Sequence, residues 1–138
     1  MYALSQEKLK AAGNKFFKSG QYPQALEKYN EALKHCKKPD DMKLIVSLHC
    51  NRALCWQQQS AFQQVIACCN EALELDPENA KALMRRSSAF EGMEKYRLAL
   101  QDVRKVLLRH PTMSVANKAQ HRLSSAVRRL KAAKAGQY

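Results

Sequence analysis

The stretch ALELDP, residues 72–77, returns 34 residues later as VLLRHP, residues 106–111. Both copies begin with a small or branched residue and end with proline, and a partial copy, ALKH, occupies residues 32–35. Self-similarity at a spacing of roughly 20–50 residues is typical of proteins built from stacked repeats, in which each repeat buries its apolar face against its neighbours. We therefore expect a fold assembled from repeated units.

A second pattern precedes each copy, in which a small residue stands three positions before an aromatic one. The pairs are Gly13 with Phe16, Ala53 with Trp56, and Ser87 with Phe90. A further small or branched residue follows each aromatic by nine positions, at Ala25, Val65 and Ala99. Small residues let two helices approach closely, and an aromatic ring fills the space beside them. The offsets predict two antiparallel helices in each unit.

The composition of the 138-residue chain favours an all-α fold. It has only four glycines and four prolines, and its apolar residues recur every three or four positions instead of alternating. This length suits one domain with a core of its own, so we expect a single domain over residues 1–138. With 24 lysines and arginines against 12 acidic residues, the net charge of +12 favours anionic partners without identifying them.

The sequence also favours a cytoplasmic protein that needs no cofactor. No apolar run approaches the roughly 18 residues of a membrane span, and residues 1–5 lack the basic-then-apolar order of a signal peptide. The odd number of cysteines argues against a disulfide framework, and their spacing matches no zinc motif. They are Cys36, Cys50, Cys55, Cys68 and Cys69. We expect them to fill helix packing, and the sequence leaves the exposure of Cys36 and Cys69 open.

These patterns resemble the tetratricopeptide repeat (TPR) family, whose helix-turn-helix unit of about 34 residues carries small, aromatic, alanine and proline markers at such offsets. The resemblance implies a right-handed superhelix of three repeats, at about residues 6–39, 46–79 and 80–113. Six extra residues between the first two repeats are expected to lengthen a loop or a helix end. An apolar stripe at helical spacing predicts a capping helix over about residues 114–134, with Ser114 as its N-cap.

In such a stack the first helix of each pair lines the concave side, so its polar residues face a ligand. Five of them resemble the dicarboxylate clamp of co-chaperones in this family: Lys10, Asn14, Asn51, Lys81 and Arg85. Lys10 and Asn14 are four positions apart, and so are Lys81 and Arg85, which places each pair on one helix face. Ammonium, guanidinium and carboxamide groups all donate hydrogen bonds to carboxylates.

The resemblance implies that these five residues bind the acidic C-terminal Glu-Glu-Val-Asp tail of Hsp90 or Hsp70. Lys10, Asn14 and Asn51 would then hold the terminal α-carboxylate, while Lys81 and Arg85 would reach the side chain of the last aspartate.

In this family, residues upstream of the tail's end decide between the two chaperones. By resemblance their contacts here would be Phe17, Leu54, Gln58, Ser88 and Glu91. Leu54 and Gln58 depart from the small and basic residues common at these places, so the sequence does not identify the preferred chaperone.

Two other functions stay open at this point, because a TPR scaffold could bind a different acidic partner, and basic residues could contact the phosphates of nucleic acid. The basic residues in question are Arg97, Arg104, Lys105, Arg109, Arg128 and Arg129, which we expect to be dispersed over outer faces. The sequence contains no glycine-rich phosphate loop or catalytic triad, so we do not expect an enzyme, although a longer parent protein could carry a catalytic domain elsewhere. The four histidines are expected at the surface or at helix ends.

Overall fold

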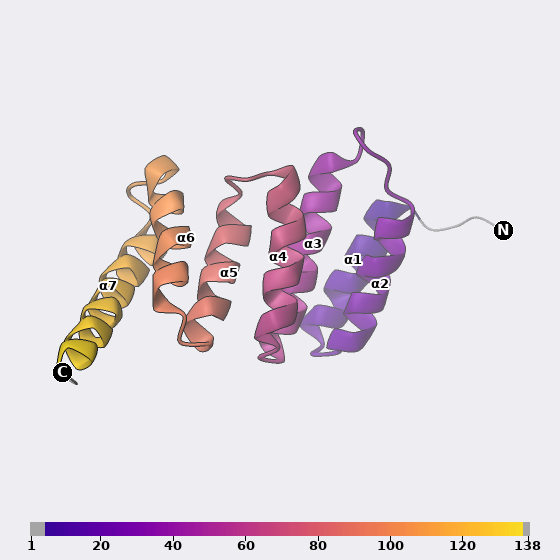
Figure 1. Cartoon of the computed structure of the whole chain (residues 1–138). Helices are drawn as coiled ribbons and strands as arrows, with labels where there is room; N and C mark the ends of the chain where they lie inside the picture. Colours follow the sequence, from indigo (N-terminus) through magenta and orange to yellow (C-terminus); the bar gives the residue numbers. More distant parts are fainter. Residues whose placement is uncertain (1–4, 137–138) are drawn as a thin grey trace.

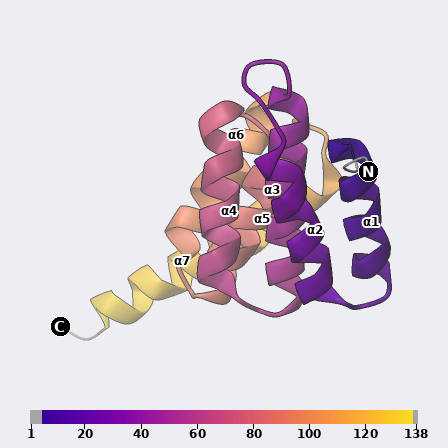
Figure 2. The ribbon, with the colours of Figure 1, turned by 90° about the vertical axis from the view of Figure 1, so that its right-hand side faces the viewer.

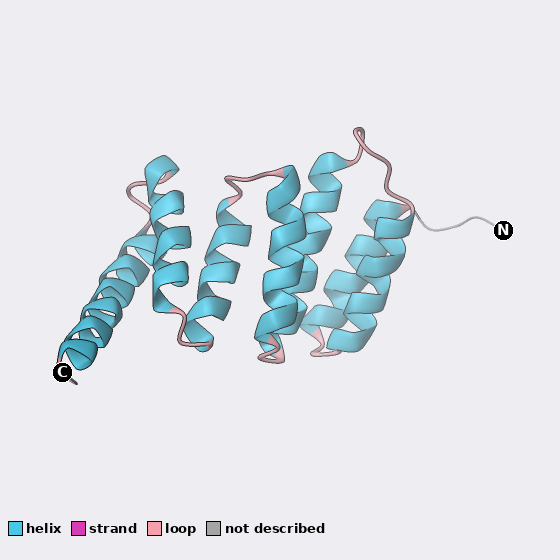
Figure 3. Ribbon diagram, viewed as in Figure 1, coloured by secondary structure: helices cyan, strands magenta, loops and turns pink. Residues whose placement is uncertain are grey.

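The computed structural model describes residues 5–136, and this part of the chain contains seven α-helices and no strand (Figures 1 and 3). The helices are α1 (Gln6–Lys18), α2 (Tyr22–Lys34), α3 (Met42–Gln58), α4 (Phe62–Leu75), α5 (Ala80–Gly92), α6 (Tyr96–Arg109) and α7 (Ser114–Ala135). Three helix pairs and a capping helix confirm the predicted fold class. The expected lack of a signal peptide rests mainly on residues 1–4, which lie outside the described residues.

The helices follow one another in a row, and each packs mainly against the helices before and after it in the chain (Figure 1). This arrangement is what a repeat protein requires, because each pair covers the apolar side of the next. The most extensive contact between helices that are not consecutive is that between α3 and α5, the first helices of neighbouring pairs. That contact builds one wall from the second and third pairs. None of the described helices is sufficiently long and apolar for a membrane span.

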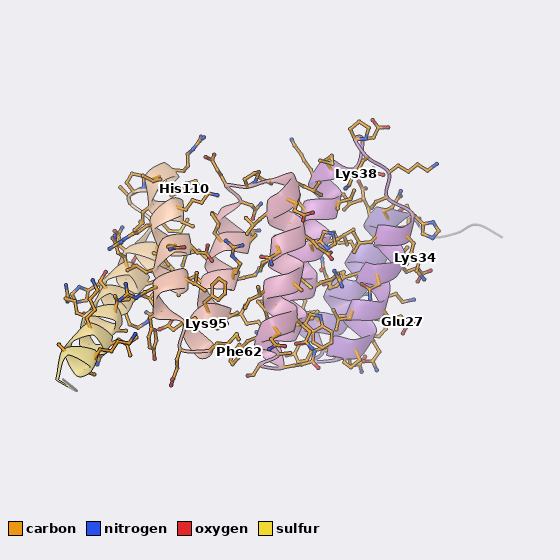
Figure 4. The ribbon with its side chains drawn as sticks, in the orientation of Figure 1. Glu27, Lys34, Lys38, Phe62, Lys95 and His110 are labelled. Carbon is orange, nitrogen blue, oxygen red and sulfur yellow. The ribbon has the colours of Figure 1, made fainter. Side chains whose placement is uncertain are left out.

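Glycine marks the closest helix approaches. A Cβ atom on Gly13 of α1 would lie 2.5 Å from the Cε1 atom of Tyr29, so α1 can lie this close to α2 only because the side chain is missing. Likewise, a Cβ atom on Gly92, at the end of α5, would lie 2.6 Å from the ring of Phe62, which Figure 4 labels at the start of α4. At the position of Gly13 in the third pair, Ser87 is buried, and its hydroxyl donates to the carbonyl of Ala99 at 2.9 Å.

A left-handed residue turns the chain within each helix pair. Gly20, Ser60 and Glu94 have φ angles of 76°, 55° and 61°, and each lies in the short link between the two helices of its pair. Glycine adopts this conformation without steric cost, whereas Ser60 and Glu94 adopt it with their Cβ atoms close to the backbone. The same turn geometry therefore strains the second and third pairs more than the first.

The structure also shows what the extra residues and the predicted cap do. The longer link leads into α3, which has 17 residues against 13 in α1 and in α5. The expectation that Ser114 caps α7 is wrong, since Met113 is the N-cap and Ser114 is already helical. The amide of Asn117 instead donates to the carbonyls of Pro111 and Met113, which ties this helix start to the preceding loop.

All five cysteines are free thiols, and the structure decides their exposure. Cys36 is half-buried, whereas Cys69 is buried together with Cys50, Cys55 and Cys68. Burial raises the pKa of the Cys69 thiol to about 12 and that of Cys55 to about 11. The buried thiols stay protonated near neutral pH and act as apolar packing groups.

Exchanging the residues of the left-handed turns should change stability in opposite directions. We expect Glu94→Gly to raise the free energy of unfolding by about 1 kcal/mol, because glycine relieves the strain, and Gly20→Ala to lower it by a similar amount. Urea denaturation followed by circular dichroism measures both. Nothing lies within 4 Å of a Cβ atom at Gly20, so the loss there would come from the backbone. A destabilising Glu94→Gly would contradict this reading of the turn.

Candidate functional site

The first and second helix pairs meet at the carboxamide of Asn14. Its Oδ1 accepts a hydrogen bond from the hydroxyl of Tyr29 at 2.5 Å and another from Nδ2 of Asn51 at 3.2 Å. With its oxygen engaged by these two donors, Asn14 has its own Nδ2 group left to donate. Asn51 likewise uses one of its two N–H groups on Asn14 and keeps the other. Two carboxamide donors from different helices therefore lie side by side.

The buried side chain of Tyr29 holds Asn14 in this arrangement. Its side chain is only 2% exposed, and burial, with a smaller contribution from Cys55, raises the pKa of Tyr29 to about 12. The hydroxyl therefore remains a donor at neutral pH. Tyr29 was not among the predicted site residues. The sequence did contain a signal for this contact, the pair Gly13-Asn14. Gly13 leaves room for the ring of Tyr29, and the side chain of Asn14 accepts the hydrogen bond from the Tyr29 hydroxyl.

Arg85 reaches across from α5 to α3. Its Nη1 atom donates to the backbone carbonyl of Cys50 at 3.0 Å, directly before Asn51 in the chain. Because an arginine has five N–H donors, this bond orients the guanidinium and leaves further donors for a ligand. Lys81 lies one turn earlier on α5 and, together with Asn51, lines a cleft of about 680 Å³. Asn51, Lys81 and Arg85 are thus gathered at the junction of α3 and α5.

Lys10 is the member of the set that the structure places least directly. It is half-buried on α1, one turn before Asn14, and therefore shares that residue's helix face. A hydrogen bond joins Asn14 to Asn51, and Arg85 binds the carbonyl of Cys50, the residue before Asn51. Lys10 joins the group through its position on the helix and not through a bond to the others.

A second cleft, of about 450 Å³, lies next to this group and shares Arg85 with it. Its lining includes Leu54, Ser88 and Glu91, three of the five residues expected to contact the upstream part of a peptide. The other two do not line it. Gln57 takes the place expected for Gln58, and Phe17 packs edge to face on Tyr22, with ring centroids 5.4 Å apart.

The capping helix supplies one wall of this second cleft, which the sequence analysis did not foresee. Val115, Lys118 and Arg122 of α7 all line it. Arg122 donates two hydrogen bonds, of 2.7 and 3.0 Å, to the carboxylate of Glu91 on α5. This pair of bonds fixes α7 relative to α5 along the cleft. The spacing of three and four positions from Val115 to Arg122 was the available signal, because it places the three side chains on one helix face.

One histidine departs from its predicted position. His49 was expected at the surface or at a helix end, but it lies within α3 and its side chain is only 12% exposed. Its Nδ1 atom is 3.0 Å from a carboxylate oxygen of Glu71, and Arg52 lies 3.4 Å from the same oxygen. Burial lowers the pKa of His49. Among residues 5–136, no group of three or more histidine, cysteine, aspartate or glutamate side chains is arranged to hold a metal ion.

Comparison with known proteins gives consistent results. A sequence model described as tetratricopeptide repeat matches residues 46–79. Sperm-associated antigen 1A of Danio rerio is 37% identical over 122 residues, which cover 85% of this chain but only 28% of that protein. The chain thus spans less than a third of this relative.

Two solved TPR domains are similar to this chain over nearly their whole length. The TPR domain of Arabidopsis OM64 is 31% identical and superposes with a TM-score of 0.78, covering 88% of this chain and 95% of that one. The first TPR domain of Spaghetti (RPAP3), solved with the HSP90 peptide SRMEEVD, is 28% identical with a TM-score of 0.79. That match covers 89% of this chain and 95% of the other.

The buried hydroxyl of Tyr29, whose pKa burial raises, should make stability depend on pH in the alkaline range. We expect Tyr29→Phe to lower the free energy of unfolding by about 1 kcal/mol at neutral pH, because Asn14 loses a donor. The pKa of Tyr29 rises from its ordinary value of 10.0 to about 12 on folding, so this contribution is complete below pH 10 and is lost as the pH rises through 12.

Denaturation of the wild type and of Tyr29→Phe across pH 7–12 measures the difference between the two proteins. Taking that difference removes the contribution of the buried thiols, whose raised pKa values act in the same direction. A difference that stays constant up to pH 12 would show that folding does not raise the pKa of Tyr29.

Proposed function

The chain belongs to the tetratricopeptide repeat family, and we propose that it is a co-chaperone adaptor module that binds the acidic C-terminal tail of Hsp90 or Hsp70. The observation that carries this proposal is the hydrogen bond between Asn14 and Asn51, which leaves each carboxamide an N–H group to donate, together with the bond from Arg85 to the carbonyl that directly precedes Asn51. Donors held in this way suit an oxyanion. Support comes from the RPAP3 domain, which was solved with a peptide ending in Glu-Val-Asp.

In the proposed complex the five residues divide between two carboxylates. Lys10, Asn14 and Asn51 hold the terminal α-carboxylate of the tail, and Lys81 and Arg85 hold the side chain of its last aspartate. Hydrogen bonds from charged groups contribute roughly 1.5–3 kcal/mol each, so loss of one cation is expected to weaken binding by roughly tenfold or more. An internal aspartate or a C-terminal amide lacks the free α-carboxylate and would leave the first three residues without their acceptor.

The second cleft then receives the residues that precede the end of the tail. Leu54, Met84 and Val115 offer apolar contact to an aliphatic side chain, and Lys118 offers a cation to an acidic one. Arg85 lines this cleft and also binds the carbonyl that directly precedes Asn51, so an extended peptide could pass from Asn51 into the second cleft. We call the region from the paired carboxamides to this cleft the peptide groove. The capping helix would thereby take part in distinguishing the tails of the two chaperones.

The proposed role is adaptation and not catalysis, and binding to cytosolic chaperones would place the protein in the cytoplasm. A TPR scaffold that binds another acidic partner is the alternative. The two proposals differ in whether the partner needs a free C-terminal carboxylate. A partner that is bound through internal acidic residues does not need one.

Calorimetry with the pentapeptide Met-Glu-Glu-Val-Asp tests the proposal, with the free-acid and C-terminal amide forms compared at about 0.15 M salt. We expect the free acid to bind at least about tenfold more tightly than the amide, and Lys81→Ala or Arg85→Ala to weaken its binding by about tenfold. Lys105→Ala is the matched control, because it removes the same charge from α6, away from the groove.

Equal affinity for the two forms of the peptide would overturn the proposal. So would a loss for Lys105→Ala as large as that for Lys81→Ala, because binding would then follow total charge. Competition between the Hsp90 and Hsp70 tails would identify the preferred chaperone.

A further inference from the structure

Most of the net positive charge lies at the C-terminal end of the protein. Residues 95–136 contain eleven of the 24 lysines and arginines but only one acidic residue, Asp102. Asp102 is 4% exposed and accepts two hydrogen bonds, of 2.9 and 2.7 Å, from Arg86 of α5. Arg86, which lies outside this segment, therefore already neutralises the segment's single carboxylate. The cations of α6 and α7 have no acid of their own segment to pair with.

Four of these cations surround one cleft between α6 and α7. The cleft has a volume of about 390 Å³ and is lined by Arg97, Leu100, Gln101 and Arg104 of α6 and by Ser124, Val127, Arg128 and Lys131 of α7. Each helix contributes positions at intervals of three, four and seven residues, which form one helix face. The expectation that the basic residues are dispersed over outer faces is wrong for Arg97, Arg104 and Arg128, because packing of α7 on α6 brings them together.

The arginines of this cleft differ from four other arginines in the described part of the chain. Arg52, Arg86, Arg109 and Arg122 each lie within ion-pair distance of a carboxylate, at 2.6 to 3.4 Å. Within residues 5–136, no carboxylate lies within 4.0 Å of the charged nitrogens of Arg97, Arg104 or Arg128. The contact that Arg128 does make is a 3.2 Å hydrogen bond from Nη2 to the hydroxyl of Ser125. The wall of the cleft thus concentrates positive charge without an internal counterion.

We propose that the α6–α7 cleft is a second binding site, for a small ligand or headgroup that carries two or more phosphate groups. Its volume lies in the range of small-molecule sites, about 300–1,000 Å³. Four cations around so small a space call for a ligand of high charge density, and each phosphate monoester carries about 1.5–2 negative charges against one for a carboxylate. The planar fork of arginine matches pairs of phosphate oxygens, and Leu100 and Val127 offer apolar contact to the carbon skeleton.

This site is distinct from the peptide groove and goes beyond the function proposed above. The α7 residues of the groove are Val115, Lys118 and Arg122, whereas those of the basic cleft belong to the later turns, Ser124 to Lys131, where α7 packs beside α6. Figure 2 shows these later turns running away from the first helix pairs. Two anionic ligands could therefore be bound at the same time, through different faces of one helix.

The test uses the whole chain and inositol hexakisphosphate as the probe. Calorimetry and thermal unfolding at about 0.15 M salt compare the wild type with the double variant Arg104→Gln/Arg128→Gln. Arg129→Gln/Lys134→Gln is the matched control, because it removes the same charge from exposed positions of α7 that do not line the cleft. We expect the probe to raise the melting temperature of the wild type and of the control. In the cleft variant, Kd should rise at least about tenfold, while the control changes less than about threefold.

Two further measurements separate a binding site from a structural role and identify the source of the phosphates. The ligand-free cleft variant should melt no lower than the wild type, since repulsion between unpaired cations is removed. Arg97→Gln alone should weaken binding of the probe, and the variants should leave the affinity for the tail peptide unchanged. Phosphatidylcholine vesicles with and without phosphatidylinositol 4,5-bisphosphate distinguish a lipid headgroup from a free ligand.

The proposal would be overturned if neither the probe nor the bisphosphate vesicles bound. It would also be overturned if cleft and control variants lost equal affinity. Binding of a 20-base-pair DNA duplex that is weakened equally by both double variants, without probe binding specific to the cleft, would indicate a diffuse nucleic-acid surface instead.

Discussion

The close approach between helices is the constraint on which the rest of the structure depends. At Gly13 the backbone of α1 lies against the ring of Tyr29, and at Gly92 the end of α5 lies against Phe62 of α4. Small residues at these positions let each helix lie close to the next, so the first helices of successive pairs come to face the same side. The hydrogen bond between Asn14 and Asn51, 37 positions apart in the chain, is a direct result of that packing.

The close packing also explains how Asn14 and Arg85 are oriented before any ligand binds. The ring that occupies the space over Gly13 carries the hydroxyl that fixes Asn14, so one buried side chain both spaces the helices and orients a donor. Arg85 is held in a similar way by a backbone carbonyl of α3. Groups oriented in advance lose less conformational freedom on binding than free surface side chains do. A site of this kind can bind a short, flexible peptide through few contacts.

The sequence predicted the parts of the fold that depend on local spacing. Repeated stretches such as ALELDP and the small residues at Gly13, Ala53 and Ser87 each report on a helix and its nearest neighbour, so the helix pairs and the capping helix could be expected from them. The rotation of α7 could not, because it is decided by the packing of Ala116, Ala119 and Leu123 against α6. That rotation alone determines that Lys118 lines the groove while Arg128 joins Arg97 and Arg104. The half-buried position of His49 similarly depends on how α3 packs with its neighbours.

The distribution of the cysteines has a consequence for how the opening of this protein could be followed. The four buried thiols all belong to α3 and α4, the middle pair, while Cys36 follows α2 and is half-buried. A helix row held mainly by contacts between successive helices can fray from either end while its centre stays closed. An alkylating reagent would therefore label the interior thiols only when the middle of the row separates. Labelling of the four buried thiols would therefore report separation of the middle helix pair and would not respond to fraying of the helices at either end.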